Sequence, residues 1–112
     1  MKTERTWGYY HVLHKVGAHT KVKELTVMPK TCLSMQRHAQ RAEFWFVAEG
    51  EATVYTLDSS TDRDIKDQLT KHQHSWIDLN EWHQLCNETD QPLRLIEIQY
   101  GDNCVEEDIT RL

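Results

Sequence analysis

Four side chains that could hold one metal ion stand out in this chain of 112 residues. Gln36 and His38 are two positions apart, and residues i and i+2 of a strand point to the same face. Glu43 opens the next segment of alternating apolar residues, where an ionised carboxylate is costly unless it is paired or metal-bound. His83 follows a turn-forming stretch much further along. Two imidazoles and two oxygens suit a divalent ion, zinc first, with manganese, iron, nickel or cobalt as alternatives.

The elements that would position these side chains read as short strands. Runs rich in Val, Ile, Thr, Tyr and Trp recur at short intervals, and long helical periodicity is missing. The predicted strands are Trp7–Leu13, Lys21–Val27, Leu33–His38, Glu43–Val47, Ala52–Leu57, Ser75–Leu79, His83–Cys86 and Leu93–Tyr100. Evenly spaced short strands favour an all-β sandwich or closed barrel.

Turn chemistry separates several of these runs. Glu49-Gly50-Glu51 places a glycine between two strands, and the stretch from Asn87 to Pro92 has turn-forming composition. The segment Asp58–Lys71 reads as a surface loop or hairpin, with one short helix candidate inside it at Asp62–Leu69.

Composition narrows the possible partners and the compartment. The formal net charge of −5 argues against nucleic acid as a partner, because an acidic chain repels phosphate backbones. The mean hydropathy of −0.73 and the lack of a long apolar run argue against a membrane span, and no signal-peptide pattern opens the chain. We therefore expect a cytoplasmic protein whose three cysteines, Cys32, Cys86 and Cys104, are reduced thiols.

The spacing of the four candidate ligands resembles the cupin family. Its first motif has two ligands separated by one residue, a Glu after four more residues and a Gly after a further six; here these are Gln36, His38, Glu43 and Gly50, with Gln36 replacing the usual His. In the second motif His83 and Asn87 match, whereas Asp78 and Asn80 replace a Pro and a Gly. The resemblance implies an all-β double-stranded β-helix, the jelly-roll barrel of cupins, forming a single domain over residues 1–112.

Further segments resemble the cupin domain of type II mannose-6-phosphate isomerases, which is often fused to mannose-1-phosphate guanylyltransferase. The matching segments are Arg5–Gly8, Lys21–Lys23, Leu25–Val27, Pro29, Leu33–Gln36, Arg41–Glu43 with Trp45, Leu95–Gln99 with Gly101, and Glu107–Arg111. This resemblance implies a metal-dependent isomerase that converts mannose 6-phosphate to fructose 6-phosphate. It also implies a sugar phosphate as the small-molecule partner.

The family reading assigns expected roles to residues outside the ligand set. Lys23 shares a strand face with apolar residues and is a candidate for proton transfer, because a desolvated lysine has a lowered pKa. Arg111 is expected to hold phosphate over the barrel mouth, and Arg41, Glu97 and Gln99 are expected to contact substrate. Simpler readings stay open: an edge-strand Lys23, a fraying Arg111 and a surface or dimer ion pair for Arg41.

Departures from the family pattern keep other functions open. Gln40 and Phe44 stand where the family usually has histidines, and Lys30 replaces a Gly. If those histidines are needed for proton transfer, the chain is a non-catalytic cupin that binds a sugar phosphate or sugar nucleotide. An iron oxygenase with the same ligands is the least favoured alternative.

Several side chains are predicted to lie away from the site. We interpret His72-Gln73-His74 as a solvated turn, and His11, His14 and His19 as surface or dimer-face residues. Phe44 and Phe46 alternate with the inward-facing residues of their strand, which suits a second sheet or a dimer contact. We expect a homodimer.

Overall fold

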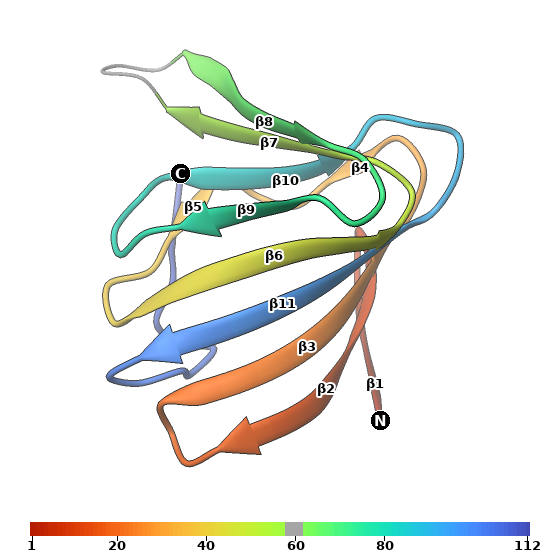
Figure 1. Cartoon of the computed structure of the whole chain (residues 1–112). Helices are drawn as coiled ribbons and strands as arrows, with labels where there is room; N and C mark the ends of the chain where they lie inside the picture. The colour runs from red at the N-terminus through yellow and green to blue at the C-terminus, as the bar shows by residue number, and fades with distance from the viewer. Residues whose placement is uncertain (58–61) are drawn as a thin grey trace.

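The computed structural model describes residues 1–57 and 62–112, and every regular element in that part is a β-strand (Figure 1). One sheet has the order β1 (Lys2–Arg5), β2 (Gly8–Val16), β3 (Thr20–Val27), β11 (Leu93–Gly101), β6 (Arg41–Glu49) and β9 (His74–Ile77). The other has the order β12 (Thr110–Arg111), β5 (Gln36–Arg37), β10 (His83–Asn87), β7 (Ala52–Leu57) and β8 (Arg63–Leu69), with β4 (Thr31–Cys32) also paired to β10. All pairings are antiparallel, so the all-β jelly-roll prediction is confirmed.

The two sheets face each other, and the segment after β11 crosses from one sheet to the other (Figure 1). This crossing ends in β12, which pairs with β5 and places Arg111 opposite Gln36. No helix long and apolar enough to cross a membrane occurs in residues 1–57 and 62–112.

Alternation along β6 and β11 determines which side chains enter the space between the sheets. In β6 the odd-numbered positions from Arg41 to Val47 are buried, and the even-numbered ones are only half-buried. In β11 the buried positions are Leu93, Leu95, Glu97 and Gln99. Because side chains alternate across a strand, each of these strands delivers both apolar and polar groups to the interior.

The apolar groups gather into one cluster between the sheets. Its fully buried members include Val27, Val47, Val54, Leu85, Leu93 and Leu95. The buried charged and amide side chains of β3, β6 and β11 are Lys21, Lys23, Arg41, Glu43, Glu97 and Gln99. In each of these three strands, the polar positions lie toward one end and the apolar positions toward the other.

Both predicted turns are confirmed. Gly50 connects β6 to β7 with φ of 88°, and a Cβ at this position would lie 2.6 Å from the carbonyl oxygen of Pro92. Only glycine fits such a backbone without strain. The turn after β10 is held by Asn87, whose Nδ2 donates to the Gln91 carbonyl oxygen at 2.7 Å and whose Oδ1 accepts from the Thr89 amide at 3.0 Å.

Two of the family departures occupy left-handed backbone positions. Lys30, which stands for a Gly, has φ of 58°, and Asn80, which stands for the Gly of the second motif, has φ of 60°. Asn tolerates this region better than other non-glycine residues, whereas Lys does not. The turns of the family pattern are therefore kept without their glycines.

The helix predicted within Asp62–Leu69 is wrong. Residues Arg63–Leu69 form β8, which pairs antiparallel with β7 with one register shift between Val54 and Tyr55, and this pairing overrides the weak local preference. Residues 58–61 of the predicted loop lie outside the described residues. The predicted strand Leu33–His38 is also too long, because only Gln36–Arg37 pairs there.

The prediction of three reduced thiols is wrong for two of them. Cys32 and Cys86 lie opposite each other on the paired strands β4 and β10 and form a disulfide. Cys104 is free and buried. The pairing joins residues 54 positions apart, which no local spacing rule reveals.

Candidate metal centre and substrate pocket

Three of the four predicted ligands meet in the interior. His38 follows β5, Glu43 lies in β6 and His83 opens β10, so both sheets contribute. One ligand atom from each lies within 4.8 Å of those of the other two, and no more than 2% of any of the three residues is exposed. The spacing of these residues therefore correctly predicted that Glu43 and the distant His83 lie beside His38.

The hydrogen bonds of the two histidines direct their Nε2 atoms toward this cluster. His38 Nδ1 lies 2.6 Å from the carbonyl oxygen of Asp108, and His83 Nδ1 lies 2.8 Å from that of Glu81. A carbonyl only accepts, so each Nδ1 carries the hydrogen and each Nε2 has a lone pair. Metal-binding histidines are commonly oriented in this way. His83 Nε2 is buried and has no hydrogen-bond partner among the described residues.

Burial keeps both imidazoles neutral near pH 7. It lowers the pKa of His38 to about 4, with the nearby Arg41 guanidinium adding to the effect. Burial also lowers the pKa of His83. Neutral imidazoles are the form that ligates metal, so the donor set fits a divalent cation without prior loss of a proton.

Glu43 is held by two protein donors. Arg41 Nε donates to its Oε2 at 3.0 Å, and Trp45 Nε1 donates to its Oε1 at 2.8 Å. Arg41 is itself buried, and burial would lower its pKa, but the Glu43 carboxylate outweighs this and raises that pKa. The surface interpretation of Arg41 is therefore wrong, because this guanidinium compensates a buried carboxylate.

Gln36 lies beside the cluster. It is opposite His83 in the β5–β10 pairing and is half-buried. Its Oε1 accepts a hydrogen bond from the Ser34 hydroxyl at 3.2 Å, and its side chain lines the pocket described below. The structure thus brings Gln36 to the site, and its role as a ligand stays a prediction.

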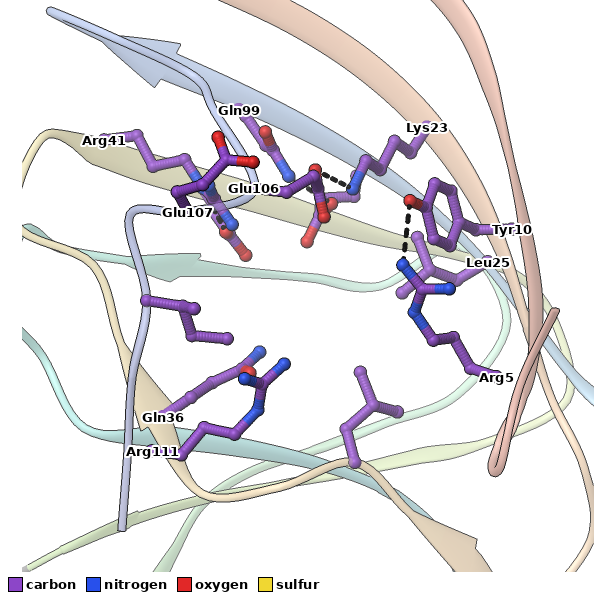
Figure 2. Close-up of a pocket in the computed structure, with 14 residues that line it drawn as sticks. Arg5, Tyr10, Lys23, Leu25, Gln36, Arg41, Gln99, Glu106, Glu107 and Arg111 are labelled. Atoms are coloured by element: carbon purple, nitrogen blue, oxygen red, sulfur yellow. Dashed lines mark hydrogen bonds and ion pairs between the residues drawn. The ribbon is translucent and has the colours of Figure 1, made fainter. Parts of the chain in front are cut away.

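A pocket of about 330 Å³ opens over this region (Figure 2). Its polar lining is Arg5, Lys23, Gln36, Arg41, Glu43, Glu97, Gln99, Glu106, Glu107 and Arg111, and Tyr10, Leu25, Leu33 and Ile109 complete it. All of the predicted catalytic and substrate-binding residues are therefore in one place. Their assigned roles stay predictions.

Lys23 lies in the pocket wall as half of an ion pair. Its Nζ donates to Glu106 Oε2 at 2.7 Å, the same oxygen that Lys21 Nζ approaches at 3.3 Å. Burial would raise the pKa of Glu106, but the hydrogen bonds and charges of Lys23 and Lys21 together outweigh this and lower that pKa to about 2. Because β3 lies between β2 and β11, the edge-strand interpretation of Lys23 is wrong.

Glu97 and Gln99 form the polar wall of β11. Glu97 is opposite Lys23 on one side, and Gln99 is opposite Glu43 on the other. Gln99 Nε2 donates to Glu97 Oε1 at 2.9 Å, which leaves Gln99 Oε1 buried and without a partner in the described part of the chain. Burial and the nearby Glu43 raise the pKa of Glu97 to about 8. The wall therefore offers an exchangeable proton and an acceptor for a ligand hydroxyl.

Arg111 lies in the paired strand β12 and lines the pocket beside Gln36 (Figure 2). Its backbone is paired with β5, so the interpretation as a fraying terminal residue is wrong. The paired backbone places the guanidinium at the pocket.

Some pocket residues escaped the sequence reasoning. Arg5, Tyr10 and Glu106 line the pocket, and Asp108 positions His38: besides its carbonyl contact, its carboxylate accepts from the amides of Ala39 and Gln40 at 3.0 and 2.8 Å. They lie near the two chain ends, in or beside the segments Arg5–Gly8 and Glu107–Arg111, which served only as evidence of the family resemblance. The one signal in the sequence was the run of polar residues between Gly101 and Thr110.

The two positions that lack the family histidines lie outside the pocket. Gln40 is exposed, and Phe44 is on the outer face of β6, where its ring is 4.6 Å from that of Trp76. Neither lines the pocket. These two substitutions therefore remove no group from the pocket wall.

The remaining histidines are distributed as expected with one exception. His14 and His19 are exposed and His11 is half-buried. His72 lies in a turn with φ of 71°, as the solvated-turn prediction requires. His74 instead opens β9, where its ring is 5.3 Å from that of Phe44.

Solved structures with similar folds are cupins at low sequence identity. The capsular polysaccharide assembling protein CapF of Staphylococcus aureus superposes with a TM-score of 0.82 at 14% identity, over 100% of this chain and 34% of CapF. The oxalate decarboxylase of Lactobacillus farciminis gives 0.80 at 16% identity, over 100% of this chain and 33% of the enzyme. The predicted cupin fold is thus confirmed.

Relatives identified by sequence are much more similar to this chain than the solved structures are. The xanthan biosynthesis protein XanB of Xanthomonas campestris pv. campestris is 40% identical over 98% of this chain, and the alginate biosynthesis protein AlgA of Pseudomonas aeruginosa is 40% identical over 96%. The mannose-1-phosphate guanylyltransferase of Escherichia coli is 38% identical over 96%. The chain spans only 21–22% of these relatives.

A family model covers the chain from end to end. The model described as the C-terminal domain of mannose-6-phosphate isomerase matches residues 1–112. This agrees with the buried His–Glu–His cluster and with the segments on which the resemblance was based. The chain therefore belongs to the mannose-6-phosphate isomerase C-terminal family.

Proposed function

We propose that this chain is a metal-dependent isomerase that converts mannose 6-phosphate to fructose 6-phosphate. The observation that carries the proposal is the buried cluster of His38, Glu43 and His83 beside a polar pocket. His83 Nε2 has no hydrogen-bond partner among the described residues. His38 Nε2 lies 3.4 Å from Glu43 Oε2 and accepts from Arg41 at 3.3 Å, and Gln36 lies next to the cluster. A divalent ion held by these four residues would polarise the oxygens of the reacting carbons. Zinc is the first candidate for this ion.

The charge of the pocket supports an anionic substrate. Four cationic and four acidic side chains line it, and one of the acids, Glu97, has a pKa raised to about 8 and is mostly protonated near pH 7. The lining is therefore positive on balance within a chain of net charge −5. A bound divalent ion would increase this difference.

Isomerisation moves one proton between adjacent carbons. A base takes the proton from C2 of the aldose while O1 gains a proton, which gives an enediol; the carbon proton then returns to C1 as O2 loses its hydroxyl proton. Glu97 is a buried carboxyl in the pocket wall, and a bound divalent ion would favour its ionised form, which suits the removal and return of this proton. Lys23 Nζ donates to Glu106 in the pocket wall and would also donate toward a substrate oxygen. Gln99 Oε1 would accept from a hydroxyl.

The direct test is turnover of mannose 6-phosphate by protein loaded with zinc, manganese or cobalt, coupled to detection of fructose 6-phosphate. Glu97→Gln should lose most of the turnover, since general-base catalysis contributes roughly 100- to 10,000-fold, and should keep its metal. Gln40→His is the matched control: Gln40 is outside the pocket, so turnover should not change. Folded, metal-loaded protein without turnover would reject the proposal.

The alternative function is binding of a sugar phosphate or sugar nucleotide without catalysis. One observation favours it: both oxygens of Glu43 already accept hydrogen bonds from Arg41 and Trp45, so this carboxylate is compensated by the protein. Calorimetry that detects sugar-phosphate binding in a sample without isomerase turnover would support this function over the first.

We also propose that two chains associate through the outer face of the sheet that contains β6, β9 and β11. Phe44, Trp76, Ile98 and Tyr100 form an apolar surface there, and 53% of Trp76 is exposed. Light scattering on the wild type should give the mass of a dimer, and Trp76→Asp should give that of a monomer. A monomeric wild type at micromolar concentration would reject this proposal.

The cytoplasmic location and the absence of a nucleic-acid partner stay predictions.

A further inference from the structure

The cations around the pocket differ in what they already bind. Lys21 and Lys23 share the carboxylate of Glu106. Arg41 donates to Glu43 and, through its NH1 nitrogen, to the Val105 carbonyl oxygen at 2.8 Å. Within residues 1–57 and 62–112, Arg5 and Arg111 are the pocket cations without an ion-pair partner. An incoming anion would meet these two uncompensated groups first.

Arg5 is held in place by Tyr10. It ends β1 next to the turn into β2, and its guanidinium carbon lies 5.4 Å from the centre of the Tyr10 ring. One terminal nitrogen donates to the Tyr10 hydroxyl at 3.5 Å and the other to the Glu4 carbonyl oxygen at 3.0 Å. A guanidinium has five N–H groups, so Arg5 keeps donors available for a ligand. Its planar fork matches phosphate geometry.

Arg5 and the candidate ligand Gln36 extend from different walls of the pocket. Figure 2 shows Arg5 on the side of Tyr10, with Gln36 and Arg111 on the other side. The space between them is bordered by Leu25 and Leu33 and by the polar wall of β11. A ligand with a metal-binding end and an anionic end would span this space.

We propose that Arg5 binds the phosphate of the substrate, at the side of the pocket away from the metal ligands. The inference rests on the proposed function and adds a specificity-determining residue to it. The site would select sugars whose phosphate is remote from the reacting carbonyl carbon. Glu97 and Gln99 would face the hydroxyls between the two ends. The hairpin of β1 and β2 would then be part of the binding site as well as of the sheet.

The test is calorimetry on metal-loaded protein with three probes: mannose 6-phosphate, inorganic phosphate and unphosphorylated mannose. Arg5→Gln should weaken mannose 6-phosphate binding about 10- to 100-fold, the loss expected for a charge-assisted hydrogen bond. Binding of inorganic phosphate should fall in parallel, and that of mannose should not change. Arg5→Lys keeps the charge without the fork and should lie between the wild type and Arg5→Gln.

Lys2→Gln is the matched control. Lys2 lies in the same strand and is stacked 4.3 Å above the ring of Tyr9, outside the pocket. It loses the same charge and should bind mannose 6-phosphate within about twofold of the wild type, as expected for exposed charges. Elemental analysis should show equal metal content in all variants.

Several outcomes separate this inference from the isomerase proposal. Equal affinities of Arg5→Gln and Lys2→Gln would overturn it, and so would an equal loss for mannose and mannose 6-phosphate. A wild type that binds neither phosphate probe would also overturn it. Phosphate binding that depends on Arg5 in protein without turnover would leave the inference standing and reject the isomerase.

Discussion

The interior has two halves built from the same strands but of opposite character. The apolar half contains Val27, Val47, Leu93 and Leu95, each fully buried. The polar half contains Lys23, Glu43, Glu97 and Gln99, which are also at least 94% buried and lie in the same three strands. Burial is thus nearly equal in both halves, and only the chemistry differs.

This contrast separates stability from function. Burying an aliphatic side chain stabilises a fold by about 1.5–3 kcal/mol, whereas buried charges give back most of their attraction as lost hydration. The apolar half therefore accounts for folding. Buried charges that cost this much hydration are retained where a reaction or a ligand requires them. We therefore assign the polar half to function.

The largest effect should come from removing a ligand in the polar half. His38→Ala removes one of the two inward Nε2 atoms and should lower metal affinity by more than about 100-fold, beyond the loss seen for outer-shell partners. Competition with a chelating dye measures the affinity. His74→Ala, in the exposed β9 position, is the control and should bind like the wild type. Full metal occupancy in His38→Ala would mean that the ligand assignment is wrong.

A cavity in the apolar half should affect stability without affecting the metal. Leu95→Ala should lower the free energy of unfolding by about 2–5 kcal/mol, because Leu95 is fully buried in the cluster. Urea denaturation measures this change, and the folded fraction should keep its metal. Ile98→Ala, three residues along β11 on the outer face, should cost less than half as much. Equal costs would show that the two faces of this strand are not packed differently.

The two halves should also differ in their response to acid. In chelator-treated protein the pKa of His38 is about 4, against 6.5 in the unfolded chain. Below pH 6.5 the unfolded chain binds a proton that the folded chain does not, so stability should fall as the pH drops from about 6.5 to 4, by an amount on the order of 3 kcal/mol.

Glu97 acts in the opposite sense, because its folded pKa is raised to about 8 and its protonated form favours folding until the pH rises through that value. The histidine effect is therefore cleanest in Glu97→Gln protein, measured by urea denaturation at several pH values. Adding His38→Asn to the Glu97→Gln protein should reduce the dependence of the free energy of unfolding on pH between pH 6.5 and 4. An unchanged slope would exclude His38 as its cause.

The smallest predicted effect concerns the backbone and neither half. Lys30→Gly should raise the free energy of unfolding by less than about 1 kcal/mol, because relief of the left-handed backbone is partly offset by the flexibility of glycine in the unfolded chain. Lys71→Gly, at an exposed turn position without a positive φ, should instead destabilise by about 0.5–1 kcal/mol. Thermal melts compare the two, and destabilisation of equal size in both would contradict the strain argument.

Much of this molecule was predictable from short-range patterns. Alternation predicted the strands that carry Glu43 and Glu97, Gly50 and Asn87 marked two turns, and the spacing of Gln36, His38 and Glu43 indicated the cupin motif. These features depend on a few neighbouring residues, since the side-chain period of a strand and the conformational freedom of glycine are local properties. Local composition failed for β8, where pairing with β7 decides the conformation.

Contacts between distant segments required the folded chain. The disulfide of Cys32 and Cys86, the hold of Asp108 on His38 and the ion pair of Lys23 with Glu106 all depend on which strands become neighbours. The same is true of Arg5 beside the pocket and of Gln40 and Phe44 outside it. The register between strands and the packing of the two sheets bring such residues together, and the residue spacing within one segment predicts neither of them.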